Sequence, residues 1–363
     1  RRMSGGRRMT ALAMGAWAGL LLQGCAAGDG PSVEPSIVPE RAAFANGDSG
    51  EDAWRPRRPV ATYSIVALDP DTGELGVAVQ SHWFSVGAVV PWAEPGGGAV
   101  AAQSLVEPAY GPLGRDLMRY GRSAPNALAG LIESDTAPQI RQVAMIDAAG
   151  RVAAHTGANC IAAAGHIVDE EGRFSVQANL MTRETVWPAM AEAYRTTKGD
   201  LAERMLAALE AAEHEGGDIR GRQSAALLVV ASEPTGTPWT DRRFDLHVAD
   251  HPEPLVELRR LVRLQRAYLH MNEGDVAIEE GDYERANEAY SSAERYAPQI
   301  VEIPFWRAVT LVGAGELEQA LPIFRRVFER EPIWAELVPR LVASGFLPDD
   351  EGITERILEQ RSE

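Results

Sequence analysis

Short apolar runs separated by turn residues fill residues 60–251 of the 363-residue chain. Residues 65–68 and 75–79 form the clearest pair, and residues 70–73 between them (Pro-Asp-Thr-Gly) are typical of a tight turn. This pattern predicts a β-hairpin that begins at Thr62. A hydroxyl at the first residue of a strand suits chemistry in which a residue's own α-amine acts as its base, although Thr also occurs at strand starts without any function.

The rest of this stretch alternates between short strands and amphipathic helices. A second strand pair is predicted at residues 87–91 and 98–103, around a Gly-rich turn. Strands, then a pair of helices, then the same order again predict two sheets that face each other, with helices on both outer sides. The other predicted strands are residues 142–147, 152–155, 174–177, 224–231 and 244–248, and the predicted helices are residues 112–120, 124–132, 184–197 and 201–213.

A 34-residue repeat marks the region 262–345. Gly281, Tyr283, Ala286 and Pro298 recur as Gly315, Leu317, Ala320 and Pro332. This period and residue order resemble the tetratricopeptide repeat, which predicts the helix pairs 264–280 with 283–296 and 303–314 with 317–330. Such arrays need about three repeats to be stable, and this chain has two. Helices 256–264 and 334–344 are therefore expected to act as caps, unless the array packs on the preceding domain. Residues 346–363 are a C-terminal tail.

The helical repeats predict a protein or peptide partner. A structural appendage or a dimerisation surface remains the alternative, which leaves a homo-oligomer open.

The first 25 residues have the pattern of an export signal, with four arginines among the first eight residues and an apolar stretch at 9–22. Residues 22–25 (Leu-Gln-Gly-Cys) resemble the lipobox of bacterial lipoproteins, in which Cys25 is acylated; a plain secretory signal is the alternative. Residues 26–59 are rich in Gly, Pro, Ser and acidic residues and are expected to be a flexible linker. We therefore expect an exported protein, either secreted or held in the cell envelope by its lipid alone.

Charge and cysteine content exclude several functions. A net charge of −17 argues against nucleic acid or an anionic lipid surface as a partner of the folded part. Two cysteines provide neither a disulfide framework nor a four-ligand zinc site, and no metal or other cofactor is expected. Cys160 with His155 or His166 would allow a thiol nucleophile, but a Cys among small residues is more typical of packing.

Seven segments resemble, in order, the family called domain of unknown function 1028. They are residues 61–67 (ATYSIVA), 76–81 (GVAVQS), 90–94 (VPWAE), 110–112 (YGP), 174–179 (FSVQAN), 220–226 (RGRQSAA) and 250–254 (DHPEP). The resemblance covers residues 60–261. Because that family is placed in the N-terminal-nucleophile (Ntn) hydrolase superfamily, it implies an α+β fold built as a four-layer α-β-β-α sandwich.

The resemblance also implies a set of site residues. Thr62 would be the nucleophile, with its free α-amine as base, and the Gln103 backbone and the Asn179 side chain would stabilise an oxyanion. Proteasome-like members tune the nucleophile with a Lys, which residues 89–94 lack. Arg222 is the predicted substitute. The predicted substrate-binding residues are Ser81, Trp83, Glu94, Tyr110 and Gln177.

Each of these roles has an ordinary structural alternative. Asn179 could cap a turn, Gln103 could bind a loop, and Arg222 could belong to a solvated charged loop. The sequence thus predicts an amidohydrolase that forms an acyl-Thr62 intermediate and requires cleavage of the Ala61–Thr62 bond. The alternative is a non-catalytic envelope binding or scaffold protein whose repeats recruit a partner.

Overall fold

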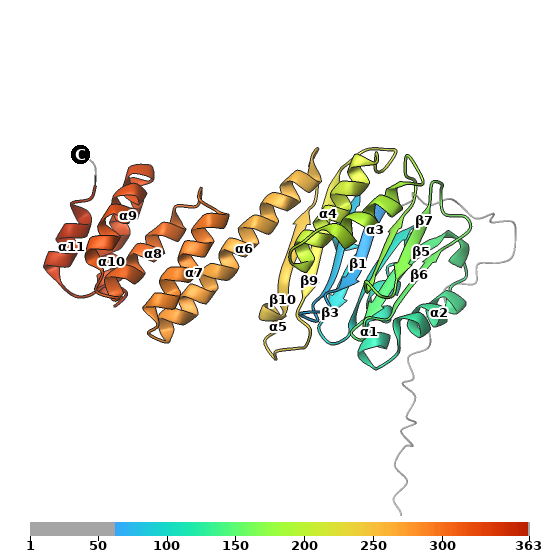
Figure 1. Cartoon of the computed structure of the whole chain (residues 1–363), viewed down its shortest axis with the longest axis horizontal. Helices are drawn as coiled ribbons and strands as arrows, with labels where there is room; N and C mark the ends of the chain where they lie inside the picture. Colours follow the sequence, from blue (N-terminus) through green and yellow to red (C-terminus); the bar gives the residue numbers. More distant parts are fainter. Residues whose placement is uncertain (1–61, 362–363) are drawn as a thin grey trace, which may run out of the picture. The chain divides into compact units, whose positions relative to one another are not determined.

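The structure, a computed structural model, describes residues 62–361. The predictions of an export signal, of acylation at Cys25, of a linker and of cleavage after Ala61 all concern residues outside the described part. The described part has two antiparallel sheets followed by a helical C-terminal region (Figure 1).

The predicted hairpin forms the centre of the larger sheet. Thr62, the first residue of β1 (Thr62–Leu68), lies opposite Ser81, the last residue of β2 (Leu75–Ser81). Gly73 adopts φ 74° in the turn between them, a conformation that glycine takes without strain. The six strands follow the order β10-β9-β2-β1-β8-β7, in which the remaining members are β7 (Gly165–Asp169), β8 (Phe174–Ala178), β9 (Ser224–Val230) and β10 (Arg242–Val248).

The smaller sheet packs its inner face against the larger one. Its order is β3-β4-β5-β6, and its strands are β3 (Pro91–Glu94), β4 (Gly98–Ser104), β5 (Arg141–Asp147) and β6 (Val152–Thr156). Val66 and Leu68 of β1 meet Ala101 of β4 and Ile146 of β5 in a buried apolar layer between the sheets.

Helices cover the outer face of each sheet, as the order of strands and helices predicted. Alternate residues of a strand point to opposite faces, so Ile65 and Ala67 of β1 face away from the inter-sheet layer, toward helices. The helices α3 (Val186–Thr196) and α4 (Leu201–His214) cover the larger sheet, and α1 (Tyr110–Arg119) and α2 (Ala124–Ser134) cover the smaller one.

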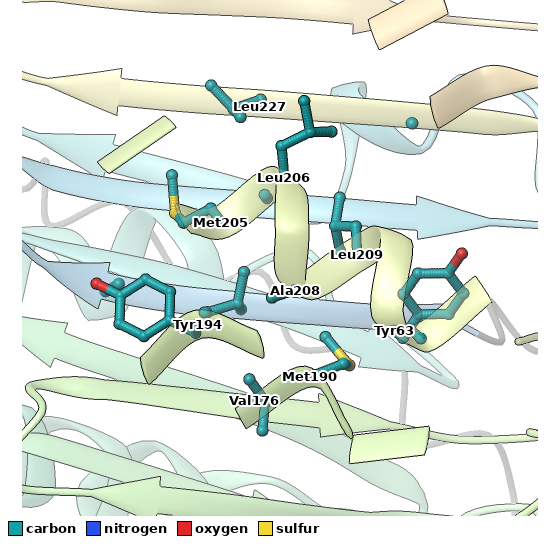
Figure 2. Close-up of a cluster of buried hydrophobic side chains, with 14 of the residues drawn as sticks. Tyr63, Val176, Met190, Tyr194, Met205, Leu206, Ala208, Leu209 and Leu227 are labelled. Carbon is teal, nitrogen blue, oxygen red and sulfur yellow. The ribbon is translucent and has the colours of Figure 1, made fainter. Parts of the chain in front are cut away.

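The largest hydrophobic core lies between the larger sheet and α3 and α4. Figure 2 shows Met190 and Tyr194 of α3 and Met205 of α4 among the side chains directed onto the strands. All three are completely buried, and burial of a large apolar side chain contributes about 1.5–3 kcal/mol. A Cβ at Gly76 would lie 2.5 Å from Met205 Cε, so α4 approaches β2 this closely only because position 76 is glycine.

Two parts of the sheets differ from the prediction. The expected strand 87–91 is wrong: Val86–Ala88 forms a short 3-10 helix (η1), and β3 begins at Pro91. The Val86 N–H donates to Ser224 Oγ on β9, and a Cβ at Gly87 would lie 2.3 Å from His247 Nδ1 on β10, so tertiary packing fixes this turn. The edge strand β7 was not predicted, because its residues are only partly buried and show no clear apolar alternation.

The helix α6 (Pro254–Glu279) connects the sheets to the C-terminal region. The prediction of a separate cap at 256–264 is wrong, because this segment and the first repeat helix form one continuous 26-residue helix. Leu258 and Val262 join the core of the larger sheet, whereas Met271 packs with α7. The remaining elements are η2 (Pro138–Ile140), α5 (Pro238–Asp241), α7 (Tyr283–Tyr296), α8 (Glu302–Gly313), α9 (Leu317–Arg330), η3 (Pro332–Leu337), α10 (Val338–Ala343) and α11 (Glu351–Leu358).

The main-chain hydrogen bonds of the helical region repeat with the 34-residue period. Gly281 and Gly315 both follow a helix and adopt φ 75° and 81°. Their N–H groups donate to Ile278 and Val312, and the next N–H groups donate to Ala277 and Leu311, which is the Schellman pattern of helix ends. Tyr283 and Leu317 then begin α7 and α9 and are both half-buried. The helix pairs and their equivalence are confirmed; a tetratricopeptide identity stays a prediction.

Within residues 62–361, no helix combines the length and the apolar character needed to cross a bilayer.

Candidate active site

The space between the sheets is apolar at one end and polar at the other. Val66 and Leu68 lie at the apolar end, whereas Thr62 and Ser64, on the same face of β1, lie at the polar end. Buried polar side chains of β4, β5 and β8 extend this end. We call the set the Thr62 cluster: Thr62, Ser64, Gln103, Gln142, Gln177 and Asn179, all at most 1% exposed.

Gln142 is the centre of the Thr62 cluster. Its Nε2 donates to the main-chain oxygens of Ala178 (2.9 Å) and Gly165 (3.2 Å). Because a carbonyl oxygen can only accept, these two contacts fix which end of the amide is nitrogen. Gln142 Oε1 therefore faces the opposite way, where it accepts from Gln103 Nε2 (2.7 Å) and Asn179 Nδ2 (2.8 Å).

Two donors hold the Thr62 carbonyl group. Gln103 Nε2 donates to the Thr62 oxygen at 3.0 Å, and the Asn179 main-chain N–H donates to it at 3.1 Å. Gln103 thus contacts Thr62 through its side chain, and its predicted role as a backbone oxyanion donor stays a prediction. The Ser64 hydroxyl donates to Gln103 Oε1 at 2.6 Å and accepts from Gln177 Nε2 at 3.2 Å. The start of β1 is therefore tied to both sheets.

The Thr62 hydroxyl lies beside Ser81. Its Oγ1 is 3.3 Å from Ser81 Oγ, and both residues are fully buried. Ser81, one of the predicted substrate-binding residues, is therefore next to the predicted nucleophile. Trp83, two residues further, packs against the inter-sheet core, and its carbonyl accepts from the Ser224 hydroxyl.

A cavity of about 320 Å³ opens where β2 ends and β9 begins. His82, which follows Ser81, and Gln223, which precedes Ser224, line it together with His251. Because Ser224 and Thr62 both pair with Ser81, this cavity lies beside the strand ends that carry the Thr62 cluster.

Several features of the Thr62 cluster are typical of functional sites. Asn179 Oδ1 and Gln177 Oε1 are buried without a hydrogen-bond partner among the described residues. Ser104 and Leu180, which directly follow Gln103 and Asn179, have φ of 70° and 58°. Such left-handed non-glycine residues store about 1–3 kcal/mol of strain and occur preferentially near active sites.

A hydrogen-bonded chain links the Thr62 cluster to a histidine. Gln142 Nε2 donates to Thr156 Oγ1 at 2.9 Å, and Thr156 Oγ1 lies 2.8 Å from His166 Nδ1. Burial, and next the neighbouring His155, lower the pKa of His166, so it is neutral at neutral pH. The sequence pattern did not indicate Ser64, Gln142 or Thr156 as site residues, and it suggested His166 only as a partner of Cys160. Strand alternation offered a signal, because Gln142 shares its strand face with the apolar Ala144 and Ile146.

Cys160 does not have the surroundings of a thiol nucleophile. Its Sγ donates to the Arg141 main-chain oxygen at 3.3 Å, and burial raises the pKa of its thiol. His155 Nε2 lies 2.8 Å from the Pro138 carbonyl oxygen, so this nitrogen is engaged elsewhere.

Glu94 and Tyr110 lie away from the Thr62 cluster. Glu94 pairs with Gly98 at the far end of β4 from Gln103, and its carboxylate binds Arg115 Nε at 3.0 Å. The Tyr110 hydroxyl donates to Asp135 Oδ2 at 3.1 Å in the core between α1, α2 and the outer face of the smaller sheet. Because Glu94 lies at the far end of its strand and Tyr110 on the outer face of the smaller sheet, the fold does not bring either residue together with Thr62.

Arg222 lines the cavity of about 320 Å³ where β2 ends and β9 begins, but its ion pairs lie outside the Thr62 cluster. Its Nε donates to Glu213 at 2.6 Å, and it forms a second ion pair with Glu253. Glu213 also accepts from the hydroxyl of Tyr63, whose side chain packs on the helix-covered face of β1. Burial, and next the Glu213 carboxylate, raise the pKa of Tyr63 well above its usual value. Arg222 is thus linked to the residue after Thr62, and its predicted tuning of the nucleophile stays a prediction.

The composition of the Thr62 cluster limits its chemistry. Its side chains are hydroxyls and carboxamides, none of which takes up a proton near neutral pH. Among residues 62–361, no three His, Cys, Asp or Glu side chains are placed to hold a metal ion. The cluster can therefore orient a hydroxyl and donate hydrogen bonds, but a base for that hydroxyl must be another group.

Comparison with known proteins agrees with this architecture. A family model described as "Family of unknown function (DUF1028)" matches residues 62–258. The crystal structure of protein SPO2555 from Silicibacter pomeroyi, which carries the same family description, is similar to this chain with 28% sequence identity and a TM-score of 0.50. The match covers 56% of this chain and 88% of that chain. No curated protein matches the sequence.

Proposed function

Because the chain belongs to the DUF1028 family, we propose that it is an Ntn-type hydrolase in which Thr62 attacks an amide bond of a small or peptide-like substrate. The observation that carries this proposal is the Thr62 cluster. Two donors hold the main-chain carbonyl of Thr62, and the buried Thr62 hydroxyl lies among side chains that cannot act as a base for it. The packing of helices on the outer faces of two facing sheets supports assignment to the α-β-β-α Ntn sandwich. The family match begins at Thr62, as expected if the shared domain begins at its nucleophile.

The reaction follows from the group that accepts the Thr62 proton. A free α-amine has a pKa of about 7.7–8.0, so a useful fraction is unprotonated near neutral pH. It takes the hydroxyl proton while Oγ1 bonds to the substrate carbonyl carbon, and the resulting ammonium protonates the leaving amine as the C–N bond breaks. Water, deprotonated by the same amine, then hydrolyses the acyl ester and releases a carboxylic acid.

Asn179 is suited to stabilise the tetrahedral intermediate. Its Nδ2 donates one N–H to Gln142 Oε1 and has a second N–H that could bind an oxyanion. The hydrogen bond from the Asn179 main-chain N–H to the Thr62 carbonyl keeps Asn179 next to the nucleophile. Replacing Asn179 with alanine is expected to lower kcat by roughly a hundredfold or more, with little change in KM. Steady-state kinetics on the best substrate of an amide panel would measure this. Asn159→Ala removes an exposed carboxamide and serves as the matched control; equal rates for both variants would refute the role of Asn179.

The active form is expected to begin at Thr62. Within an uncut chain the Thr62 nitrogen is an amide, which cannot accept the hydroxyl proton. Amino-terminal sequencing and intact mass of the catalytically active protein should therefore identify a chain that starts with Thr-Tyr-Ser-Ile. Its kcat/KM should rise as the pH passes through about 7–8, where the α-amine loses its proton.

Two results would decide against the proposal. Active protein with an intact Ala61–Thr62 bond would require another base. A native protein that is never cut and never turns over an amide would instead support the alternative, an envelope binding or scaffold protein that recruits a partner through its helical repeats.

A further inference from the structure

Five of the twelve residues that line a groove beside α6 are arginines, although the whole chain carries a net charge of −17. Its volume is about 880 Å³. We call it the arginine groove and define it by Arg259, Arg260, Arg263, Arg266 and Arg295. Three carboxylates, those of Glu203, Glu210 and Glu257, also line it, which leaves an excess of two positive charges.

The helix geometry explains why these side chains gather. Arg259, Arg263 and Arg266 follow one another at spacings of four and three residues, which places them on one face of α6. Arg295 reaches the same groove from α7, the next helix of the region. Glu203 and Glu210 belong to α4, so the groove lies where the helical region meets the helices of the larger sheet.

Three of the five guanidinium groups are committed to ion pairs. Arg259 binds Glu210 at 2.6 Å and Glu203 at 2.8 Å. Arg266 binds Asp200 at 2.7 Å and Glu203 at 3.2 Å, and Arg260 binds Glu257 at 2.6 Å. The pairs of Arg259 and Arg266 hold α6 against α4, whereas the Arg260–Glu257 pair lies within α6.

The other two guanidinium groups are available. Arg263 and Arg295 are exposed, and within residues 62–361 neither forms an ion pair with a carboxylate. Among the described residues, Arg295 Nη2 donates only to Ser292 Oγ, at 2.8 Å. In a chain with such an excess of carboxylates, two arginines that line one groove without an acidic partner indicate a site for an external anion.

We propose that the arginine groove binds a small, multiply charged anion through Arg263 and Arg295. Guanidinium groups present parallel N–H donors that match the oxygens of phosphate or carboxylate groups, and such charge-assisted hydrogen bonds are among the strongest in proteins. The groove volume suits a small molecule. The overall negative charge repels an extended anionic surface, so a soluble phosphate-bearing ligand fits better than a membrane.

Calorimetric titration of the full chain with inorganic pyrophosphate, at about 20 mM and 200 mM salt, tests this. The wild type should bind saturably and more weakly at the higher salt, because ions screen the attraction. Arg263→Gln and Arg295→Gln should each weaken binding about tenfold, and the double variant should abolish it. Arg340→Gln, which alters an exposed arginine on another helix, is the matched control and should bind as the wild type does.

A second arm identifies the source of the phosphate. Sedimentation with vesicles of phosphatidylglycerol, against vesicles of phosphatidylcholine, asks whether the same arginines bind a lipid headgroup. Binding in either arm that is lost in the double variant supports the site. Absence of binding in both arms at low salt, or equal loss in the Arg340→Gln control, would overturn it. The proposal does not depend on catalysis by Thr62, so each can fail without the other.

Discussion

Replacing Thr62 with alanine is expected to reduce amide hydrolysis by roughly 10⁴-fold or more, because the proposed reaction forms its acyl intermediate on the Thr62 hydroxyl. Thr62→Ser keeps the hydroxyl and should retain measurable turnover. Two readouts apply: hydrolysis of a panel of amide substrates, and covalent labelling by a β-lactone, detected as a mass increase of the intact protein. The β-lactone acylates an activated hydroxyl without requiring knowledge of the natural substrate.

The control for this prediction is Thr72→Ala. Thr72 is an exposed residue in the turn between β1 and β2, where its hydroxyl accepts from the Glu74 N–H. This variant should be labelled and turn over substrate like the wild type. Full activity of Thr62→Ala would show that another residue is the nucleophile. Labelling that disappears while the fold is intact would support the proposed role.

Replacing Gln142 with leucine is expected to lower the free energy of unfolding by about 3 kcal/mol or more. Leucine removes the acceptor of Asn179 Nδ2 and the donor to the Ala178 and Gly165 carbonyls. A buried polar group without a partner costs about 1–3 kcal/mol, and at least two such groups would remain. Urea denaturation would measure the change in midpoint and slope.

Gln319→Leu is the matched control for this measurement. It makes the same substitution at an exposed position on α9 and should change the stability by no more than about 0.5 kcal/mol. A Gln142→Leu protein as stable as this control would show that the Thr62 cluster does not depend on Gln142. If the variant folds at low temperature, its kcat should fall as well, because Asn179 loses the contact that orients its amide.

The catalytic proposal and the arginine groove concern separate parts of the chain. The Thr62 cluster lies between the sheets, whereas the groove lies among α4, α6 and α7. The ion pairs of Arg259 and Arg266 connect α6 to α4, and α4 covers the strand that carries Thr62. Kinetics with and without pyrophosphate would show whether occupation of the groove changes turnover.

The sequence determined the elements whose signals are local. The turn at residues 70–73 and the apolar runs on either side of it specify the β1–β2 hairpin within about twenty residues, and they place Thr62 at its start. The 34-residue repeat likewise specified the helix pairs, because Gly281 and Gly315 end their helices through the same main-chain hydrogen bonds. These contacts form between residues close in sequence, so periodicity and turn chemistry are sufficient to predict them.

Only the tertiary structure decided the composition of the candidate site. The Thr62 cluster takes residues from four strands of two sheets, and the contact of Gln142 with Asn179 spans 37 positions of the chain. No local pattern encodes which buried amides will meet. The turn at Gly87 likewise depends on tertiary structure, because packing against β9 and β10 fixes it. The family resemblance alone assigned Glu94 to the site, but in the structure Glu94 binds Arg115 at the far end of its sheet. Local sequence sets strands and turns, whereas the pairing of the two sheets sets which polar groups surround Thr62.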